Sequence, residues 1–436
     1  MNFNAERDSL TPWINSLPED WHCSRIGNVA DVLFSNVDKH TIDDEEPVRL
    51  CNYIDVYKNG RITQKLEFME ASAEKREIQK FQVQRGDVLS TKDSETPDDI
   101  AISALVDDDL PGVLCGYHLA LMRPRSKNLY GPYLAWVHSS KRFRAQYEAR
   151  AVGVTRFGLP QYAFRAARLP LPPLPEQKRI AAYLDASCAA IDAAVAAKRR
   201  QIETLAMLLH ATLTQILKRG LKKEVVMKPS GEAWLDDIPS HWWMKRIKDI
   251  AQLKSGEGIS AEEISAADQF PVYGGNGLRG YTSSFTHDGY FPLIGRQGAL
   301  CGNINYASGK FWATEHAVVV TPLRQCDVMW LGEILRIMNL NQYSNAAAQP
   351  GLSVDRIKYL RLPVPPVEEQ VAIARHIREA NEKLTNLNSN LDEQVKSLTA
   401  YRKSLIHECV TGQRRVTDED VKRAEAQWPS ARNLQN

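Results

Sequence analysis

One segment of the sequence occurs twice, and each copy joins a proline-rich stretch to a long helical pattern. LPLPPLPEQKRIAAYLD starts at Leu169, and LPVPPVEEQVAIARHIR starts at Leu362, 193 positions later. Proline fixes φ and disfavours helix in the residue before it, so the Leu-Pro alternation predicts extended backbone. Glutamates follow at once, where the dipole of a starting helix favours negative charge. The fold must therefore accommodate two equivalent segments that pass directly from extended chain into helix.

The duplication extends beyond this segment. At the same offset, Gly158-Leu159 aligns with Gly351-Leu352. Further upstream, LPEDWHCSRIGNVADV from Leu17 aligns with IPSHWWMKRIKDIAQL from Ile238, at an offset of 221. A fixed period of self-similarity indicates a repeated architecture. Each half therefore reads as a tryptophan-containing start, a variable body, a proline-rich segment and a long helix.

Both helical patterns carry apolar residues at alternating spacings of four and three, the heptad typical of a coiled coil. The predicted seam comprises Leu184, Ile191, Val195, Ile202, Leu205, Leu209 and Ile216 in the first helix, and Ile377, Leu384, Leu391, Val395, Leu398 and Leu405 in the second. Polar residues at Lys198, Asn381, Asn388 and Arg402 interrupt the seam and either set its register or face solvent. Gly220 and Gly412 are predicted helix ends.

About 45 helical residues would span roughly 65–70 Å. If the two helices pair, the simplest arrangement is antiparallel, with one body at each end and a pseudo-twofold relation between the halves. The predicted fold class is α+β, with two strand-rich domains separated by two long helices that form an antiparallel coiled coil. The predicted segments are an N-terminal tail (1–16), the first body (17–168), the first helical region (169–222), a linker with the second body (223–361), the second helical region (362–413) and a C-terminal tail (414–436).

Short apolar runs bounded by turn residues predict strands in both bodies. They are VRLCNYIDV, KNGRI, FQVQRGDVL and HLALM in the first body, and PVYGGNGLRGY, GYFPLIGRQGALCGN, YASGKFW and HAVVV in the second. GGNG predicts a tight hairpin. The bodies share a faint plan, since GDVLSTK resembles YFPLIGR, and Tyr117-His118 resembles Glu315-His316. Otherwise they differ widely, which suggests the same job done on different targets.

No pattern in the chain indicates an active site. GxxxxGK[ST] is absent, and no GxGxxG follows a strand ahead of a helix. His22, His118 and His316 lack partners at metal-ligand spacing and are interpreted as structural. Seven scattered cysteines without CxxC spacing predict neither zinc nor disulfides, which fits a reducing cytoplasm. The start of the chain does not resemble a signal peptide, and no membrane span is predicted.

A net charge of only +2 means that any basic surface must be local. KRFRAQYEARAVGVTRFGLPQYAFRAAR, residues 141–168, is basic with interleaved aromatics and suits phosphate contacts, although a basic amphipathic helix on an ordinary surface is the alternative. Loop residues of the second body could read base edges, although some could be turn formers only. The predicted DNA-binding residues are Lys92, Arg142, Arg144, Arg156, Asn276, Arg279, Arg296, Gln297 and Asn303.

At this point the chain resembles a known family. The duplicated proline-rich segments, each followed by a heptad helix, resemble the two conserved regions of type I restriction-modification specificity subunits. The tryptophan-containing starts, GDVLSTK and the IGRQGA pattern resemble that family's two target recognition domains. The resemblance covers roughly Leu17 to Gln413. The first body departs most from the glycine-rich pattern of the second.

The resemblance implies a non-catalytic, DNA-binding subunit of the cytoplasm. Each target recognition domain would read half of a bipartite, asymmetric site in double-stranded DNA, and the helices would set the gap. Two modification subunits, which bind S-adenosylmethionine and methylate adenine, would dock on it, and restriction subunits using ATP and Mg would join them. The chain itself would bind no cofactor and no metal. The alternatives are a nuclease or methyltransferase with its own DNA domains, and a scaffold that does not bind DNA.

Overall fold

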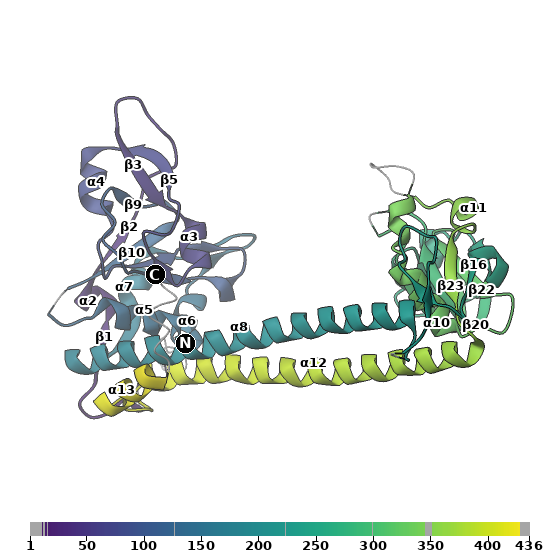
Figure 1. Cartoon of the computed structure of the whole chain (residues 1–436). Helices are drawn as coiled ribbons and strands as arrows, with labels where there is room; N and C mark the ends of the chain where they lie inside the picture. Colours follow the sequence, from purple (N-terminus) through teal and green to yellow (C-terminus); the bar gives the residue numbers. More distant parts are fainter. Residues whose placement is uncertain are drawn as a thin grey trace. The chain divides into compact units, whose positions relative to one another are not determined.

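The computed structural model describes residues 11, 14, 16–125, 127–222, 224–298, 300–344 and 351–427. Most of the predicted N-terminal tail and residues 428–436 lie outside this part of the chain. The chain divides into two compact units, Met1–Arg199 with Asp392–Asn436, and Arg200–Leu391. Each unit contains one globular body and a part of each of the two long helices, α8 (Leu174–Arg219) and α12 (Val367–Val410) (Figure 1).

Unit 1 is built on a five-stranded sheet of order β2-β10-β6-β8-β4 and a three-stranded sheet of order β5-β3-β9, which share one apolar cluster. Its strands are β1 (His22–Arg25), β2 (Ala30–Phe34), β3 (Glu46–Cys51), β4 (Arg61–Ile62), β5 (Met69–Ala73), β6 (Val88–Thr91), β7 (Asp93–Ser94), β8 (Ser103–Val106), β9 (Val113–Cys115), β10 (Leu119–Pro124), β11 (Val152–Gly153), β12 (Phe157–Gly158) and β13 (Arg168–Leu171). Its helices, besides part of α8 and α12, are α2 (Ile26–Val29), α3 (Tyr53–Lys58), α4 (Lys75–Phe81), η2 (Pro97–Asp99), α5 (Gly131–Ser139), α6 (Lys141–Glu148), α7 (Gln161–Ala166) and α13 (Asp418–Gln427).

Unit 2 is built on a six-stranded sheet of order β17-β22-β20-β21-β18-β19. Its strands are β14 (Met227–Lys228), β15 (Ile238–Pro239), β16 (Trp243–Arg246), β17 (Ala251–Ser255), β18 (Phe270–Gly274), β19 (Gly277–Thr282), β20 (His287–Gly295), β21 (Ile304–Ala313), β22 (Ala317–Pro322) and β23 (Arg361–Val364). Its shorter helices are α9 (Ile247–Ile250), η3 (Ala261–Glu263), α10 (Val328–Ile337), η4 (Leu340–Tyr343) and α11 (Val354–Ile357). The predicted α+β class with two strand-rich bodies and two long helices is confirmed.

The long helices run antiparallel. In unit 1, Lys198 Nζ donates to Gln394 Oε1 at 2.5 Å, and Arg402 Nε lies 2.9 Å from Asp192 Oδ1. The contact nearer the end of α8 (Lys198) therefore meets the position nearer the start of α12 (Gln394), so the pairing is antiparallel. In both units the start of one long helix packs near the end of the other, which is the local arrangement that the pseudo-twofold requires.

The predicted seam residues all lie on buried or partly buried positions of the two helices. Leu184 and Leu405 join the core of unit 1, and Ile377 joins that of unit 2, whereas Ile202 and Leu384 are only partly buried. Leu391, midway along α12, is also buried, so burial of the seam is not confined to the places where the helices meet the bodies.

The polar seam positions behave in two ways. Lys198 and Arg402 make the cross-helix contacts described above, so they favour one register. Asn381 faces solvent, and the side-chain oxygen of Asn388 is buried with no partner among the described residues. Both interpretations of the interruptions therefore apply, each to different residues.

The duplicated glutamate ties the start of each long helix to the tryptophan that opens the same body. Trp21 Nε1 donates to Glu176 Oε2 at 3.0 Å, and Trp242 Nε1 donates to Glu369 Oε2 at 2.9 Å. A strand pair beside each contact repeats with the same register, β1 with β13 and β16 with β23. Both copies of the repeat thus build the same attachment of body to helix.

The glutamine that follows each glutamate forms a hydrogen bond with the start of a shorter helix in the same body. Gln177 Oε1 accepts the backbone N–H of Tyr130 at 2.8 Å, just before α5, while its Nε2 donates to the Pro172 carbonyl at 2.9 Å. Gln370 does the same with Asp327, just before α10, at 3.1 Å. Helix starts leave backbone N–H groups without intrahelical partners, so each glutamine supplies an acceptor that the helix lacks.

Each body is closed by the end of the helix that belongs to the other copy of the repeat. Gly412, with φ +76°, follows α12 and lies against Pro18 and Trp21, and Gly220, with φ +77°, follows α8 and lies against Trp242. Both predicted helix ends are confirmed, in the left-handed conformation that glycine tolerates. The repeat is therefore interlocked, because neither half of the sequence completes a unit by itself.

Two expectations for the first body need correction. The second half of VRLCNYIDV is helix α3 rather than strand, because Asn52 and Asp55 form a capping box that starts a helix. In the basic stretch, Phe143, Tyr147 and Phe164 are buried in the core of unit 1. These aromatic residues therefore do not form an exposed stacking surface.

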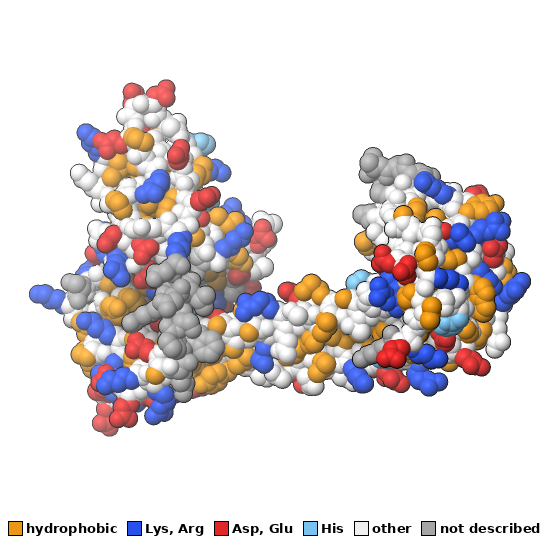
Figure 2. Space-filling view, viewed as in Figure 1, with side chains coloured by type: hydrophobic (Ala, Val, Ile, Leu, Met, Phe, Trp, Pro, Cys, Tyr) orange, Lys and Arg blue, Asp and Glu red, His pale blue; other side chains and the backbone are white. Residues whose placement is uncertain are grey.

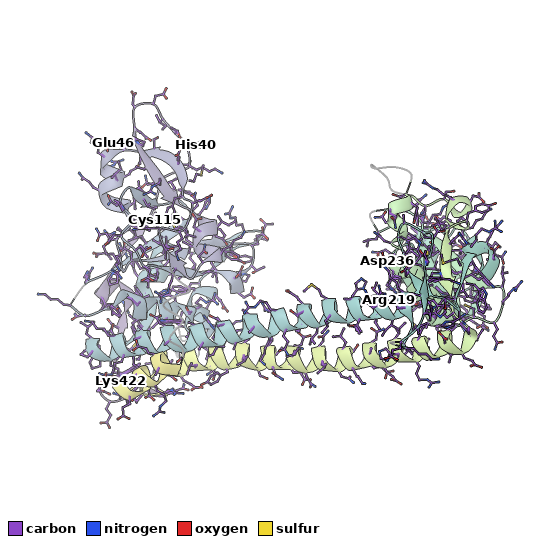
Figure 3. The ribbon with its side chains drawn as sticks, viewed as in Figure 1. His40, Glu46, Cys115, Arg219, Asp236 and Lys422 are labelled. Atoms are coloured by element: carbon purple, nitrogen blue, oxygen red, sulfur yellow. The ribbon has the colours of Figure 1, made fainter. Side chains whose placement is uncertain are left out.

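All seven cysteines are free. Cys188 and Cys409 are buried in unit 1 as small apolar residues, and burial raises the pKa of each thiol to about 12. Cys115, labelled in Figure 3, lies opposite Cys51 in the register of β9 and β3, and burial raises the pKa of both thiols. None of these buried thiols is activated, since the thiolate is the reactive form.

Candidate functional site

The two bodies share a three-stranded antiparallel sheet, and equivalent residues of the two bodies can be identified from it. The order β2-β10-β6 in unit 1 corresponds to β17-β22-β20 in unit 2. The register also agrees. Leu121 pairs with Leu33 and Leu89 in the first body, and Val319 pairs with Lys254 and Leu293 in the second. Beyond this common part the sheets differ, since β8 and β4 extend one and β21, β18 and β19 extend the other.

A cation follows directly after the same strand of the common sheet in each body. The backbone N–H of Lys92 donates to the carbonyl of His118 at 3.2 Å, and that of Arg296 donates to the carbonyl of His316 at 2.8 Å. The carbonyl of Lys92 accepts from Leu159 at 2.8 Å, and an equivalent bond at 2.9 Å joins Leu352 and Arg296. We call each set of three residues a junction, the first being Lys92, His118 and Leu159 and the second Arg296, His316 and Leu352. The faint plan seen in the sequence thus has a common backbone geometry.

The first junction is surrounded by charged and aromatic side chains. Lys92 Nζ lies 4.4 Å from the ring centre of Tyr117 and 5.0 Å from that of Phe34, and burial lowers its pKa below the ordinary value. His118 Nδ1 bonds the carboxylate of Asp93, which also lies 3.5 Å from Arg156. Two permanent cations, one histidine and one acid therefore meet at this end of the sheet.

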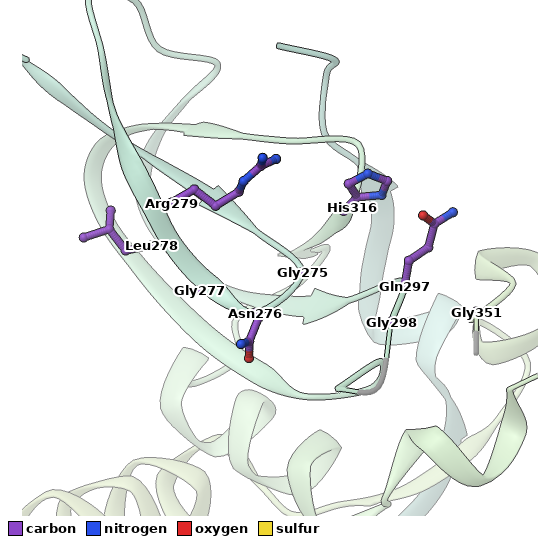
Figure 4. Close-up of a pocket in the computed structure, with 9 residues that line it drawn as sticks. All are labelled: Gly275, Asn276, Gly277, Leu278, Arg279, Gln297, Gly298, His316 and Gly351. Carbon is purple, nitrogen blue, oxygen red and sulfur yellow. The ribbon is translucent and has the colours of Figure 1, made fainter. Parts of the chain in front are cut away.

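The second junction borders a pocket of about 710 Å³ (Figure 4). It is lined by Gly275, Asn276, Gly277, Leu278, Arg279, Gln297, Gly298, His316 and Gly351. In the view of Figure 4, Arg279, Gln297 and His316 extend toward the same space, whereas Asn276 points away from them. Three polar side chains of different chemistry thus converge on one cavity.

The pocket exists because two glycine-rich segments approach each other closely. Gly275 and Asn276 form the two-residue turn between β18 and β19, so the predicted hairpin is confirmed. A Cβ on Gly295 would lie 2.1 Å from the Gly275 carbonyl oxygen, so only glycine fits there. A second hollow of about 480 Å³, lined in part by Ser255, Arg296 and Gln297, adjoins the pocket and shares Gln297 and Gly351 with it.

Several polar atoms near this pocket lack hydrogen-bond partners. Asn305 Nδ2, Glu315 Oε2 and His316 Nδ1 are buried without a partner among the described residues. Glu315 Oε1 lies 3.2 Å from His316 Nε2, so the acid and the histidine are neighbours. Unsatisfied buried polar atoms are uncommon in folded proteins and are often found at functional sites.

The structure brings some of the predicted DNA-binding residues together. Asn276, Arg279 and Gln297 line the pocket, and Arg296 lines the adjoining hollow. Asn303 contributes its backbone to the loop after β20, through bonds with Leu300 and Gly295, and lines neither cavity.

The predicted residues of the first body fall into two groups. Lys92 and Arg156 lie at the first junction. Arg142 and Arg144 lie on α6, where Arg142 NH1 is 3.3 Å from His407 Nε2 near the end of α12. Burial lowers the pKa of Arg144, whose nearest charges include those of Glu148 and the acids of η2, so it is less available to a ligand than predicted. Figure 2 shows Lys and Arg interspersed with Asp and Glu on the visible face of unit 1.

The histidines of the two junctions were interpreted from the sequence as structural. In the structure each lies at a cluster of charged groups, His118 with Asp93 and His316 with Glu315 and the pocket, and that interpretation stays a prediction. The sequence contained a signal for this position. His118 and His316 directly precede β10 and β22, and these strands pair with β6 and β20, the strands that end just before Lys92 and Arg296.

Two further properties of the described residues bear on function. No group of three or more His, Cys, Asp or Glu that could hold a metal ion occurs among them. Within the same part of the chain, α8 is long and apolar enough by composition to cross a membrane. Its alanine-rich first part, however, packs through Leu184 and Ile191 into the core of unit 1, as a core helix does.

Residues 18–204 and 239–397 match the family described as the type I restriction modification DNA specificity domain. The EcoprrI specificity subunit of Escherichia coli is 40% identical over 169 residues, which are 38% of this chain and 42% of that subunit. A putative type I restriction enzyme specificity subunit of Haemophilus influenzae is 28% identical over 115 residues, 26% of this chain and 30% of the relative. The matches therefore span less than half of these two relatives.

A putative MjaX specificity subunit of Methanocaldococcus jannaschii is 22% identical over 435 residues and covers 95% of this chain and 99% of its own length. Two solved structures share the fold at 17% identity. A chain described under the complex assembly and conformational transition of the type I R-M system has a TM-score of 0.73 and covers 90% of this chain and 98% of itself. The HsdS subunit from Thermoanaerobacter tengcongensis has a TM-score of 0.57, with coverages of 91% and 98%.

Proposed function

Because the chain belongs to the family of type I restriction-modification DNA specificity proteins, we propose that it is the DNA-recognition subunit of such a system and binds a bipartite, asymmetric site. The observation that carries the proposal is the duplicated junction. Two bodies with the same backbone geometry at Lys92 and Arg296 carry different side chains around it. Equivalent modules with divergent surroundings are what the reading of two different half-sites requires.

Each body reads one half-site of double-stranded DNA at the end of its sheet that carries the junction. In the second body, Arg279 and Gln297 are the base readers, since Arg pairs with guanine and Gln with adenine in the major groove. In the first body, Lys92 and Arg156 provide the positive charge that attracts phosphates.

The chain supplies recognition and its partners supply chemistry. Two modification subunits, which bind S-adenosylmethionine and methylate adenine, assemble on the helices and bodies, and restriction subunits that use ATP and Mg join them in the cytoplasm. The chain itself binds no cofactor and catalyses no reaction. Support comes from the family match.

The test is a body exchange followed by sequencing of methylated adenines in cells. Replacing residues 17–168 by the first body of another family member will change one half of the methylated motif and leave the other half and the gap unchanged. The matched control replaces residues 223–361 and will change the other half only. A motif altered in both halves, or in neither, by the first exchange would refute the modular proposal.

The alternatives predict different biochemistry. An enzyme with its own DNA domains would cut or methylate DNA as the purified chain alone, and a scaffold would bind no DNA. We expect the purified chain to bind DNA with an affinity that falls steeply with salt and that discriminates one motif, without modifying it. Modification by the chain alone would favour the enzyme.

A further inference from the structure

We propose that His118 and His316 are equivalent DNA phosphate contacts, one in each body, and that the residues beside them which differ between the bodies read bases. The inference rests on the proposed function and deepens it. It divides each recognition surface into a shared part that holds the DNA backbone and a divergent part that determines the sequence.

The two histidines occupy the same position in space within their bodies. The carbonyl of each accepts the backbone N–H of the cation of its junction, and each histidine precedes the strand at the centre of the common three-stranded part of the sheet. The cation also contacts the same place in both bodies. Lys92 Nζ lies over Phe34, the last residue of β2, and Arg296 NH1 lies 3.4 Å from Ser255, the last residue of β17.

The backbone bonds do not explain why both copies carry histidine. Any residue offers the carbonyl that accepts from Lys92 or Arg296, so the junction needs no particular side chain at this position. The neighbours do differ, since Tyr117 in the first body corresponds to Glu315 in the second. A side chain kept in both copies among neighbours that changed is best explained by a task common to both half-sites.

The task common to both half-sites is contact with phosphate. Bases differ between half-sites, whereas the phosphates are the same, and phosphate contacts position a protein without carrying sequence information. Both rings reach the surface, because the side chain of His118 is 44% exposed and that of His316 is 39% exposed, and in His316 the nitrogen that would make the contact is Nε2, since Nδ1 is buried. A carboxylate adjoins each ring, Asp93 beside His118 and Glu315 beside His316, and an imidazole N–H can donate to a phosphate oxygen.

Cationic side chains outnumber the acids at each junction, so an anion can still bind there. Arg156, whose side chain is 63% exposed, and Lys92 accompany His118 against Asp93. Arg279 and Arg296 lie around the pocket and hollow beside His316, against Glu315. Each junction thus combines two cations with one acid, and the histidine adds an N–H donor.

The residues that differ provide the base readers. The position after the cation is Asp93 in the first body and Gln297 in the second, and the position before the histidine is Tyr117 in the first and Glu315 in the second. The side chain of Glu315 is 46% exposed and lies beside the pocket-lining His316. A carboxylate acceptor suits the amino group of cytosine in the major groove.

The experiment compares His118→Gln and His316→Gln with Gln297→Ala and Glu315→Gln in the full chain. Binding is measured on a duplex carrying the wild-type motif and on duplexes with one half-site scrambled, over a salt series, and the methylated motif is sequenced in cells. Each histidine variant will weaken binding to all duplexes by about tenfold, the equivalent of one charge-assisted hydrogen bond, and will leave the motif unchanged. The slope of affinity against salt will become shallower by up to about one unit. The Gln297 and Glu315 variants will instead alter the second half of the motif.

His118→Arg and His316→Arg guard against a purely structural effect. Arginine donates to phosphate, so these variants will keep the affinity and the motif, whereas a structural histidine would not be rescued. A changed motif in a histidine variant, an affinity within twofold of wild type in both, or loss of folding in both the Gln and the Arg variants would overturn the inference. Failure of the proposed function is distinguishable, because the wild-type chain would then show no motif-dependent binding at all.

Discussion

Replacing Glu176 by alanine will loosen the attachment of the first body to its helix more than the same change at Glu369 loosens the second. Glu176 accepts from Trp21 Nε1 at 3.0 Å and from Arg415 Nε at 2.8 Å, and its side chain is only 4% exposed. Glu369 makes comparable bonds to Trp242 and His241, but its side chain is 29% exposed. The same glutamate of the repeat is therefore buried to different extents in the two units.

The magnitude follows from the partners that lose their acceptor. The buried indole N–H of Trp21 would be left unsatisfied, which costs about 1–3 kcal/mol. Arg415 adds about 1 kcal/mol, because its half-exposed guanidinium keeps a bond to Asp20 at 2.8 Å. The sum of about 2–4 kcal/mol corresponds to a fall of about 4–16 °C in the midpoint of thermal unfolding of unit 1. For Glu369 we expect about half of this loss, because the carboxylate is itself 29% exposed and one of its two partners, His241, is 41% exposed, although Trp242 is buried.

The assay must separate the two units, because a chain of two units does not unfold as a single two-state system. Hydrogen exchange on the full chain meets this need, read on the β1–β13 pair for unit 1 and the β16–β23 pair for unit 2. Glu176→Ala will reduce protection of the first pair only, and Glu369→Ala, the matched control, will reduce protection of the second pair to a smaller degree. An equal or larger effect of Glu369→Ala, or loss of protection in the wrong unit, would refute the reasoning.

Three further results are expected. Burial lowers the pKa of His138 to about 4, so unit 1 will lose up to about 3 kcal/mol as the pH falls from about 6.5 towards 4, and pH-dependent melting of His138→Gln will lack that loss. Gly412→Ala will cost about 2–4 kcal/mol in a denaturation series, because it forces a left-handed alanine whose Cβ lies 2.4 Å from Pro18 Cδ; a neutral result would contradict the closure of unit 1 by this turn. The antiparallel register places Leu391 level with Ile202. Seven residues inserted at both positions will lengthen the gap of the methylated motif and keep its half-sites. The same insertion in one helix alone will abolish methylation.

The sequence predicted the parts of this fold that local chemistry determines. The proline-rich segments, the two helix ends at Gly220 and Gly412 and the heptad seam follow from φ restriction, glycine conformation and apolar spacing, which act within a few residues. The α3 helix was missed because a capping box at Asn52 overrides an apolar run that reads equally well as a strand.

The candidate site was only partly predictable, because it depends on contacts distant in sequence. Arg279 and Gln297 could be named as polar loop residues, but their convergence with His316 on one pocket results from the pairing order of the sheet. Arg144 was predicted as a DNA contact from local charge, but besides Glu148 of its own helix it faces Asp98 and Asp99 of a different segment, η2. The sequence therefore shows how many charged residues a stretch contains, whereas the tertiary contacts determine which of those charges remain available to a ligand.

The interlocked repeat explains how the bodies can diverge without loss of the common framework. The contacts that attach the first body to the helices include the bond from the Trp21 indole to the Glu176 carboxylate, the bond from Tyr130 to Gln177 and the backbone of the β1–β13 pair. A body from another protein therefore needs an extended segment after an equivalent tryptophan, and a helix start that the glutamine can reach, to be accepted. If this is correct, an exchanged first body whose equivalent of Trp21 is changed to alanine will lose methylation, whereas the same exchange with the tryptophan intact will keep it.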